Sequence, residues 1–240
     1  MSQQIVLERE HGGERHLYLY DPEQGKSEQL TDGLFLDDIL DISADGKEIL
    51  FGRSPSDAAS GRVSSVHLVD ITTRAVVSYS KYRQGVFWSA NRLVLISNSN
   101  TLVEYRTDSG SEVVIGKSHS IRAIDEEEGI ALAQVNTSDE SIRQEICLWN
   151  LKTKEKEVVG YGHSACLLGP QKVLYLSGYD HQVWLWDRGQ QAKFISSPRG
   201  YKILPTSAVG RYCALILDHN REQDVYLFDK NRDLVYIIDK

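Results

Sequence analysis

The stretch QVWLWDRG, residues 182–189, places two tryptophans between aliphatic residues and then stops at an aspartate. Trp184 and Trp186 are two positions apart, so in a β-strand both side chains point to the same face. An apolar run of this length that ends in turn residues is typical of a strand buried on both faces. The sequence therefore predicts a buried middle strand, and copies of it elsewhere would define the architecture.

The same unit recurs along the whole chain. Its copies are HLYLYD (16–21), VHLVD (66–70), LVEYR (102–106), ICLWN (146–150), VWLWD (183–187) and VYLFD (225–229). Consecutive copies end 36 to 49 residues apart, and such a period, with strands and without helices, indicates the blades of a β-propeller. Each copy is followed by a polar turn and a second strand, which together predict a hairpin.

Two further strands precede five of the copies, so the predicted unit is four antiparallel strands. In the first copy the residues before the unit, 1–4, are too few and too polar to form the fourth strand. We therefore predict an all-β fold, a six-bladed β-propeller of four-stranded antiparallel blades whose first blade is three-stranded. In the alternative arrangement, residues 234–240 supply the inner strand of the first blade.

The absence of linkers predicts one domain over the whole chain. The expected blades cover approximately 1–33, 34–84, 85–118, 119–164, 165–200 and 201–240.

Two kinds of known repeat resemble parts of the chain. GHSACLLGPQKVLYLSGYDHQVWLWD, residues 162–187, resembles a WD40 repeat in its opening Gly-His and closing Trp-Asp. ISADGKEILFGRS (42–54) and HLYLYDPEQGKSEQLTDG (16–33) are similar to TolB-type propeller repeats. The resemblance implies a propeller fold and is not specific for a function.

The WD40 resemblance also implies a structural hydrogen-bond set in which a histidine bonds an aspartate. Carried over residue by residue, the set is His163, Ser177, Asp180 and Trp186. No other copy of the repeat carries the set, and Arg106 and Asn150 stand where other copies close with aspartate.

Charge and composition exclude several classes of protein. The chain has 240 residues, a net charge of −7 and 41% hydrophobic residues, as expected of a globular protein. Phosphate binding requires clustered lysine and arginine, and no long basic run is present, so nucleic acid is not expected as a partner. No apolar run approaches the roughly 20 residues that cross a bilayer, and the N-terminus lacks the pattern of a secretory signal. No membrane contact is expected.

Three cysteines lie far apart in apolar runs, at Cys147, Cys166 and Cys213. An odd number without a CxxC motif argues against a disulfide framework or a zinc ribbon. We expect buried reduced thiols in a cytoplasmic monomer.

The expected functional surface is the face that carries the long loops 52–65 and 136–145, because rigid scaffolds place function on variable loops. Aromatic and arginine residues are common anchors at interfaces. On this basis the predicted binding residues are Tyr82, Arg83, Tyr161, Tyr179, His181, Arg199 and Tyr201. The predicted function is a non-enzymatic, protein-binding scaffold that needs no cofactor and whose partner the sequence does not name.

The alternative function is a metal-dependent hydrolase or lactonase with its site at the mouth of the central channel. Asp38, His119 and His163 occupy similar positions at the start of predicted inner strands. Imidazole and carboxylate are ordinary metal ligands, so these three residues are the candidate ligands. The chain contains neither a GxSxG motif nor a glycine-rich phosphate loop.

Overall fold

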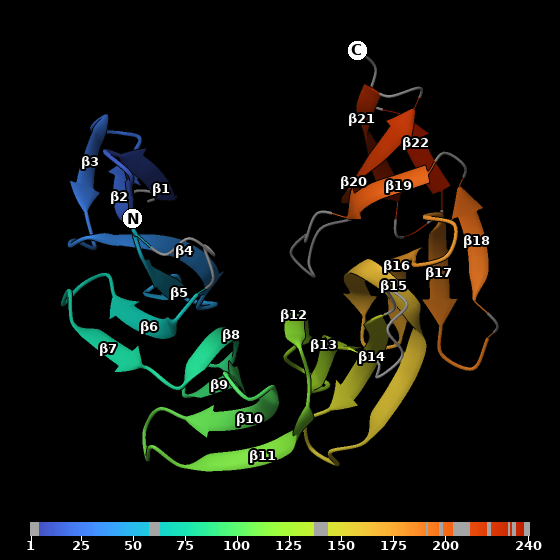
Figure 1. Cartoon of the computed structure of the whole chain (residues 1–240), viewed down its shortest axis with the longest axis horizontal. Coiled ribbons are helices and arrows are strands. Elements are labelled where there is room, and N and C mark those ends of the chain that lie inside the picture. Colours follow the sequence, from blue (N-terminus) through green and yellow to red (C-terminus); the bar gives the residue numbers. More distant parts are fainter. Residues whose placement is uncertain are drawn as a thin grey trace. The chain divides into compact units, whose positions relative to one another are not determined.

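The computed structural model consists of strands and turns. It describes residues 5–57, 63–136, 144–190, 192–196, 199–203, 212–219, 222–229, 231 and 234–237. For 196, 199–203, 212–213, 215–219, 222–224 and 234–237 the description covers the backbone only. None of the described residues lies in an α-helix, so the all-β prediction is confirmed for them (Figure 1). The chain divides into an N-terminal unit, Met1–Val114, and a C-terminal unit, Ile115–Lys240.

The N-terminal unit is built from antiparallel meanders. Its strands are β1 (Ile5–His11), β2 (Glu14–Asp21), β3 (Lys26–Gln29), β4 (Phe35–Ile42), β5 (Glu48–Pro55), β6 (Ser65–Asp70), β7 (Val76–Tyr79), β8 (Tyr82–Ser89), β9 (Arg92–Ser97), β10 (Thr101–Arg106) and β11 (Glu112–Lys117). The boundary between the two units falls within β11. Strands β4 to β7 and β8 to β11 pair in chain order, and β1 to β3 form a three-stranded group, as the sequence predicts. A single parallel bridge between β2 and β4 joins that group to the next.

The C-terminal unit repeats the pattern. Its strands are β12 (Ser120–Asp125), β13 (Ile130–Asn136), β14 (Gln144–Asn150), β15 (Lys156–Gly169), β16 (Lys172–Ser177), β17 (Val183–Asp187), β18 (Lys193–Ser196), β19 (Arg199–Ile203), β20 (Tyr212–His219), β21 (Glu222–Asp229) and β22 (Leu234–Ile237). Strands β12 to β18 form one continuous sheet, and β19 to β22 form a separate four-stranded sheet (Figure 1).

The aspartate or asparagine that closes a repeat organises the turn after it. Side-chain oxygens accept hydrogen bonds from backbone N–H groups two or three residues later at Asp21, Asp70, Asn150 and Asp229. Arg74 and Lys154, each four residues after a closing residue, adopt left-handed φ angles of 62° and 64°. The side-chain bonds hold the turn in place although neither residue is a glycine, which explains why the repeat closes on Asp or Asn.

The middle strands are buried on both faces, as QVWLWDRG predicts. The apolar residues 93–96 of β9 and 173–176 of β16 are all buried. Trp186 lies within a cluster of buried residues that includes Leu148 and Val173, and it is 7% exposed. The tryptophan pair of the opening stretch therefore belongs to the core of the C-terminal unit.

Two details differ from the predicted strand pattern. Strand β15 is one 14-residue strand where the repeat predicts two, because it pairs first with β14 and then with β16. The long connections are also shorter than expected: β5 extends to Pro55 and β13 to Asn136, so the segments between strands are 56–64 and 137–143. Residues 58–62 and 137–143 lie outside the described part of the chain.

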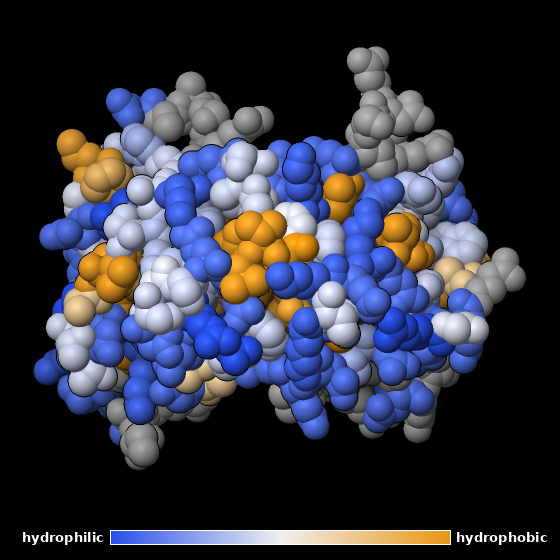
Figure 2. All heavy atoms as spheres, turned by 90° about the horizontal axis from the view of Figure 1, so that it is seen from below, coloured by the Kyte–Doolittle hydropathy of each residue, from blue (hydrophilic) through white to orange (hydrophobic). Residues whose placement is uncertain are grey.

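Hydrophobic side chains also reach the surface on two outer strands. Val76 and Val77 are exposed on β7, and Val114 is exposed on β11. Figure 2 shows one face, on which hydrophobic residues form separate patches within a largely hydrophilic surface. Strands at the edge of a sheet keep such side chains without burying them.

Replacing Gly162 with alanine is expected to destabilise the C-terminal unit. A Cβ at Gly162 would overlap the backbone carbonyl oxygen of Leu176, and backbone atoms cannot move aside cheaply. We expect a loss of about 1–3 kcal/mol in the free energy of unfolding, as for other overpacked sites. Gly169→Ala on the same strand is the matched control, because a Cβ there meets no atom within 4 Å. Urea unfolding measures both, and equal losses would contradict the packing at Gly162.

Candidate functional site

A row of polar side chains crosses four neighbouring strands of the N-terminal unit. Asp37 of β4 pairs with Arg53 of β5, and Arg53 pairs with Ser65 of β6. Directly paired residues in antiparallel strands point to the same face, so these three side chains share a face. The bridge between β2 and β4 places His16 beside Asp37, and Nδ1 of His16 is 4.0 Å from Oδ2 of Asp37. The row lies where β5 ends and β6 begins, next to a long connection.

The centre of the row is a buried ion pair. Nε of Arg53 donates to Oδ1 of Asp37 at 2.7 Å, and a second guanidinium nitrogen donates to Oδ2 at 2.9 Å. The Asp37 side chain is fully buried, and that of Arg53 is 18% exposed. The guanidinium also lies over the rings of Phe35 and Phe51, with centroids 4.4 and 5.4 Å away. This arrangement fixes the geometry of both charged groups, since a bidentate pair allows little movement.

His67 of β6 lies next to the ion pair. Its ring stacks on Phe51, with centroids 5.2 Å apart, and its Nε2 is 2.8 Å from the Ser65 hydroxyl oxygen. Burial lowers the pKa of His67, and the nearby Arg53 charge lowers it further, while Asp37 acts in the opposite direction. The imidazole is therefore uncharged at neutral pH, so its Nε2 can accept the proton of the Ser65 hydroxyl.

Two buried ring nitrogens in this row have no hydrogen-bond partner among the described residues. They are Nδ1 of His16 and Nδ1 of His67. His16 is 7% exposed, and its Nε2 is 3.2 Å from a carboxylate oxygen of Glu14. Buried polar atoms are usually satisfied, and unsatisfied ones with perturbed neighbours are frequent where proton transfer occurs. We call His16, Asp37, Arg53, Ser65 and His67 the polar row.

The depressed pKa of His67 predicts loss of stability in acid. The unfolded chain takes up a proton at a histidine pKa of about 6.5, above the pKa of His67 in the folded protein. The stabilising contribution is therefore present above about pH 6.5 and is lost as the pH falls from there through the folded pKa. Urea unfolding between pH 7 and pH 5 should show a shallower pH dependence for His67→Gln than for the unchanged chain. His11→Gln, at an exposed histidine, should retain the original dependence.

The contacts described at the predicted WD40 hydrogen-bond set join its members to other residues. The ring of His163 meets the ring of His181, with centroids 5.2 Å apart. Asp180 accepts a hydrogen bond from the backbone of Gln182, and the Ser177 hydroxyl accepts one from the backbone of Tyr179. The bond between His163 and Asp180 therefore stays a prediction.

The predicted binding residues differ in exposure. Tyr161, Tyr179 and His181 are exposed, but Tyr82 is only 1% exposed and so lies in the core instead of on the surface. Arg83 donates a hydrogen bond to Asn100 at 2.6 Å. The side chains of Arg199 and Tyr201 lie outside the described part of the chain.

The candidate metal ligands have other neighbours. Asp38 forms an ion pair with Arg15, and Nδ1 of His119 is 3.1 Å from the Asn136 amide nitrogen. Within the described residues, no three His, Cys, Asp or Glu side chains form a group that could hold a metal ion.

Two of the predicted buried thiols are confirmed. Cys147 and Cys166 are buried thiols, and burial raises the pKa of Cys147 to about 12, which leaves it a poor nucleophile. The side chain of Cys213 is outside the description. In the part of the chain that the structure describes, no helix is long and apolar enough to span a membrane.

Comparisons with known proteins identify the fold. No protein-family model and no curated protein matches the chain. Among solved structures, it is similar to an oligogalacturonate lyase in complex with manganese, at 12% identity and a TM-score of 0.67, covering 100% of this chain and 74% of that one. Pyrococcus horikoshii acylaminoacyl peptidase is similar at 12% identity and a TM-score of 0.68, over 99% of this chain and 43% of the peptidase. Porphyromonas gingivalis dipeptidyl peptidase 4 is similar at 13% identity and a TM-score of 0.61, over 98% and 44%.

These neighbours are β-propellers, and they establish a propeller fold for this chain. They also correct the predicted function. The expectation of a non-enzymatic protein-interaction scaffold is wrong, because all three neighbours are named as enzymes, and the enzymatic alternative agrees better with them. At these identities the likeness shows the fold, and the chain spans less than half of either peptidase. These structures therefore assign no reaction to this chain.

Proposed function

We propose that the chain is a hydrolase that acts on an activated acyl group, such as an ester or lactone, through Ser65 and His67. The observation that carries the proposal is the 2.8 Å distance between the Ser65 hydroxyl and Nε2 of His67, an imidazole that is uncharged at neutral pH. A hydroxyl bonded to a neutral imidazole is the usual form of an activated serine nucleophile. The proposal requires no metal ion.

Four members of the polar row, all except His16, have a role in this reaction. The Ser65 oxygen attacks the substrate carbonyl carbon while its proton passes to Nε2 of His67, which then gives the proton to the leaving group. Water releases the acyl group in a second step with the same proton transfers reversed. Arg53 faces Ser65 across the strand pair and supplies positive charge beside the developing oxyanion. Asp37 holds Arg53 in place by its two hydrogen bonds.

The comparisons support the reaction class only in general terms. Two neighbours are named as peptidases, which are hydrolases of acyl compounds. Their names say nothing about which residues of this chain act, and the chain has no GxSxG motif. A dyad at the start of β6, a strand paired on both sides, would therefore be particular to this chain.

Steady-state hydrolysis of p-nitrophenyl acetate and a small panel of lactones tests the proposal. Ser65→Ala and His67→Gln should each lower kcat/KM by roughly 10²–10⁴-fold, the usual contribution of such groups. Ser64→Ala is the matched control, because its neighbouring hydroxyl bonds the backbone oxygen of Arg53 instead of an imidazole. Hydrolysis that persists in Ser65→Ala, or that falls equally in Ser64→Ala, would refute the assignment.

We also propose that the chain forms one six-bladed propeller domain with the blade boundaries predicted from the sequence, including WD40-like and TolB-like repeats. The strand groups β1 to β3, β4 to β7, β8 to β11 and β19 to β22 support this division, as does the seven-stranded run from β12 to β18. We further propose that it acts as a cytoplasmic monomer; the buried thiols Cys147 and Cys166 support the cytoplasmic location. Solution scattering should give a radius of gyration of roughly 18 Å.

A further inference from the structure

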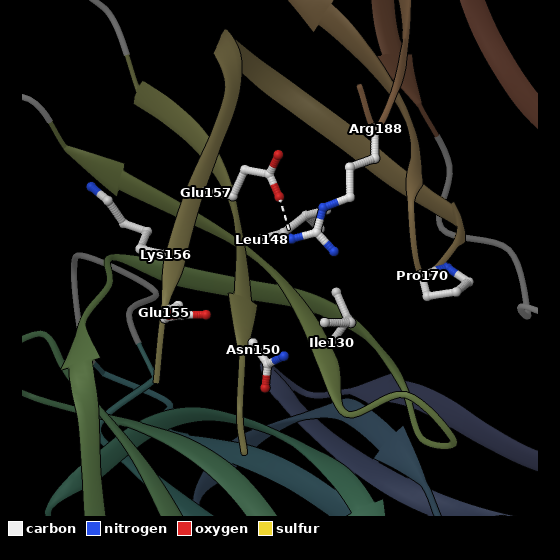
Figure 3. A pocket seen from close by; sticks show the side chains of 8 residues that line it. All are labelled: Ile130, Leu148, Asn150, Glu155, Lys156, Glu157, Pro170 and Arg188. Carbon is white, nitrogen blue, oxygen red and sulfur yellow. Dashed lines mark ion pairs between the residues drawn. The ribbon is translucent and has the colours of Figure 1, made fainter. Parts of the chain in front are cut away.

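A pocket of about 380 Å³ opens between two consecutive meanders of the C-terminal unit (Figure 3). It lies at the ends of strands where the connections are short. Its walls come from the start of β13, the end of β14, the turn before β15 with the start of β15, and the turns after β15 and β17.

The two glutamates of the pocket lie on one face of the chain. Glu155 lies in the turn just before β15, where its carboxylate accepts a hydrogen bond from the Thr153 hydroxyl at 3.0 Å, and Glu157 is the second residue of β15. Figure 3 shows both carboxylates on the side of the chain opposite the Lys156 amine. Lys156 points to the other side, where its amine bonds Glu145 at 2.8 Å. Figure 3 shows the Lys156 amine directed away from the other lining side chains. The lysine charge is therefore not available to neutralise the glutamates inside the pocket.

Arg188 provides the positive charge of the pocket. Its guanidinium is 2.8 Å from one carboxylate oxygen of Glu157, and Figure 3 shows the two side chains directed at each other. The side chains are 48% and 37% exposed, so the pair is accessible from solvent. A guanidinium has five N–H donors, and this contact leaves most of them for another carboxylate. The pocket thus holds one accessible cation and two carboxylates.

The pocket also has an apolar part. Ile130 and Leu148 are 6% and 4% exposed, and Pro170 adds a further apolar surface. A ligand that matches all of these features carries a carboxylate, an ammonium group and an apolar substituent within a small volume.

We propose that this pocket binds a small zwitterion with an apolar side chain, of the α-amino acid type. The ligand carboxylate bonds Arg188, the ammonium group bonds Glu155 and Glu157, and the side chain packs on Ile130 and Leu148. Bonds between charged groups of this kind are short and strong, so both charges of the ligand contribute to affinity. The proposal rests on the C-terminal unit alone and does not depend on the hydrolase reaction.

Isothermal titration calorimetry of the full chain with L-leucine tests the ligand class. Two analogues of the same apolar group serve as comparisons: isoamylamine, which lacks the carboxylate, and 4-methylpentanoate, which lacks the amine. L-leucine should bind at least about tenfold more tightly than either, because each analogue loses a charge-assisted bond. Equal binding of an analogue, tighter binding of glucose, or no binding of L-leucine would overturn the proposal.

Variants locate the site. Arg188→Gln and Glu157→Gln should each weaken L-leucine binding by about tenfold or more. Exposed ion pairs contribute little to stability, so both variants should fold, and circular dichroism checks this. Glu145→Gln is the matched control, because Glu145 bonds Lys156 outside the pocket. Unchanged affinity in Arg188→Gln and Glu157→Gln, or an equal loss in Glu145→Gln, would place the binding elsewhere and refute the proposal.

Discussion

Replacing Asp37 with alanine is expected to lower the free energy of unfolding by about 3–5 kcal/mol, because the change leaves the guanidinium of Arg53 largely buried without its counter-ion. The Asp37 carboxylate is fully buried and accepts two hydrogen bonds from Arg53. Removal of one member of such a pair lowers the free energy of unfolding by far more than the intact pair contributes to it. Urea unfolding at pH 7 measures the loss.

The adjacent aspartate provides the control for this prediction. Asp38 pairs with Arg15, and these side chains are 34% and 30% exposed, so Asp38→Ala should cost at most about 1 kcal/mol. The double variant Asp37→Leu with Arg53→Met should be more stable than Asp37→Ala, since no unpaired charge remains. Similar losses for Asp37→Ala and Asp38→Ala would show that the buried pair does not form.

Replacing Trp186 with alanine is expected to cost about 3–5 kcal/mol, as for other buried tryptophans. The ring is 7% exposed and packs in one cluster with Leu148, Val159 and Tyr175, so its removal leaves a cavity that these side chains fill only in part. Thermal and urea unfolding of Trp186→Ala measure the effect.

Trp184 gives the comparison within the same strand. It is partly buried and its ring meets the edge of Phe194, which is 45% exposed, so Trp184→Ala should cost clearly less than Trp186→Ala. An unchanged melting temperature in Trp186→Ala, or a larger loss in Trp184→Ala, would contradict the core assigned to this strand.

The strand pattern was predictable because it depends on short-range features. In five of the six copies of the repeat, an apolar run closed by Asp or Asn marks the same strand, and bonds such as those from the backbone at Thr72 and Thr73 to Asp70 show why that residue type recurs. The continuous strand β15 was not predictable, because pairing with β14 and then β16 depends on contacts between neighbouring meanders. The sequence in the middle of β15 contains a histidine and glycines, which resemble a turn between two strands.

The sequence analysis did not predict the polar row, because the sequence does not define which face of β4 is buried. The sequence pointed to Asp38, whereas the structure buries Asp37, and a shift of one residue in a strand reverses the face to which a side chain points. The alternation in FLDDILDI does not distinguish the two aspartates. The pairing of β2 with β4, which places His16 beside Asp37, joins residues that no local pattern connects. The sequence feature that could have indicated the row is the acidic pair Asp37 and Asp38, followed by Arg53 near the end of the next strand.

The predicted function failed because the repeat identifies a fold and propellers serve many functions. Loop length and exposed aromatic residues favoured a binding surface, although Tyr82 is in fact buried. Burial of charged groups and the perturbed pKa of His67 appear only once the strands are assembled.

Covalent labelling with a fluorophosphonate tests whether His67 activates Ser65 as a nucleophile. The reagent forms a phosphonyl ester with an activated serine and releases fluoride, and peptide mass spectrometry locates the modified residue. We predict modification of one serine per chain, at Ser65, and loss of labelling in His67→Gln with Ser64→Ala unaffected. No modification, modification of a different serine, or equal labelling in His67→Gln would contradict the claim.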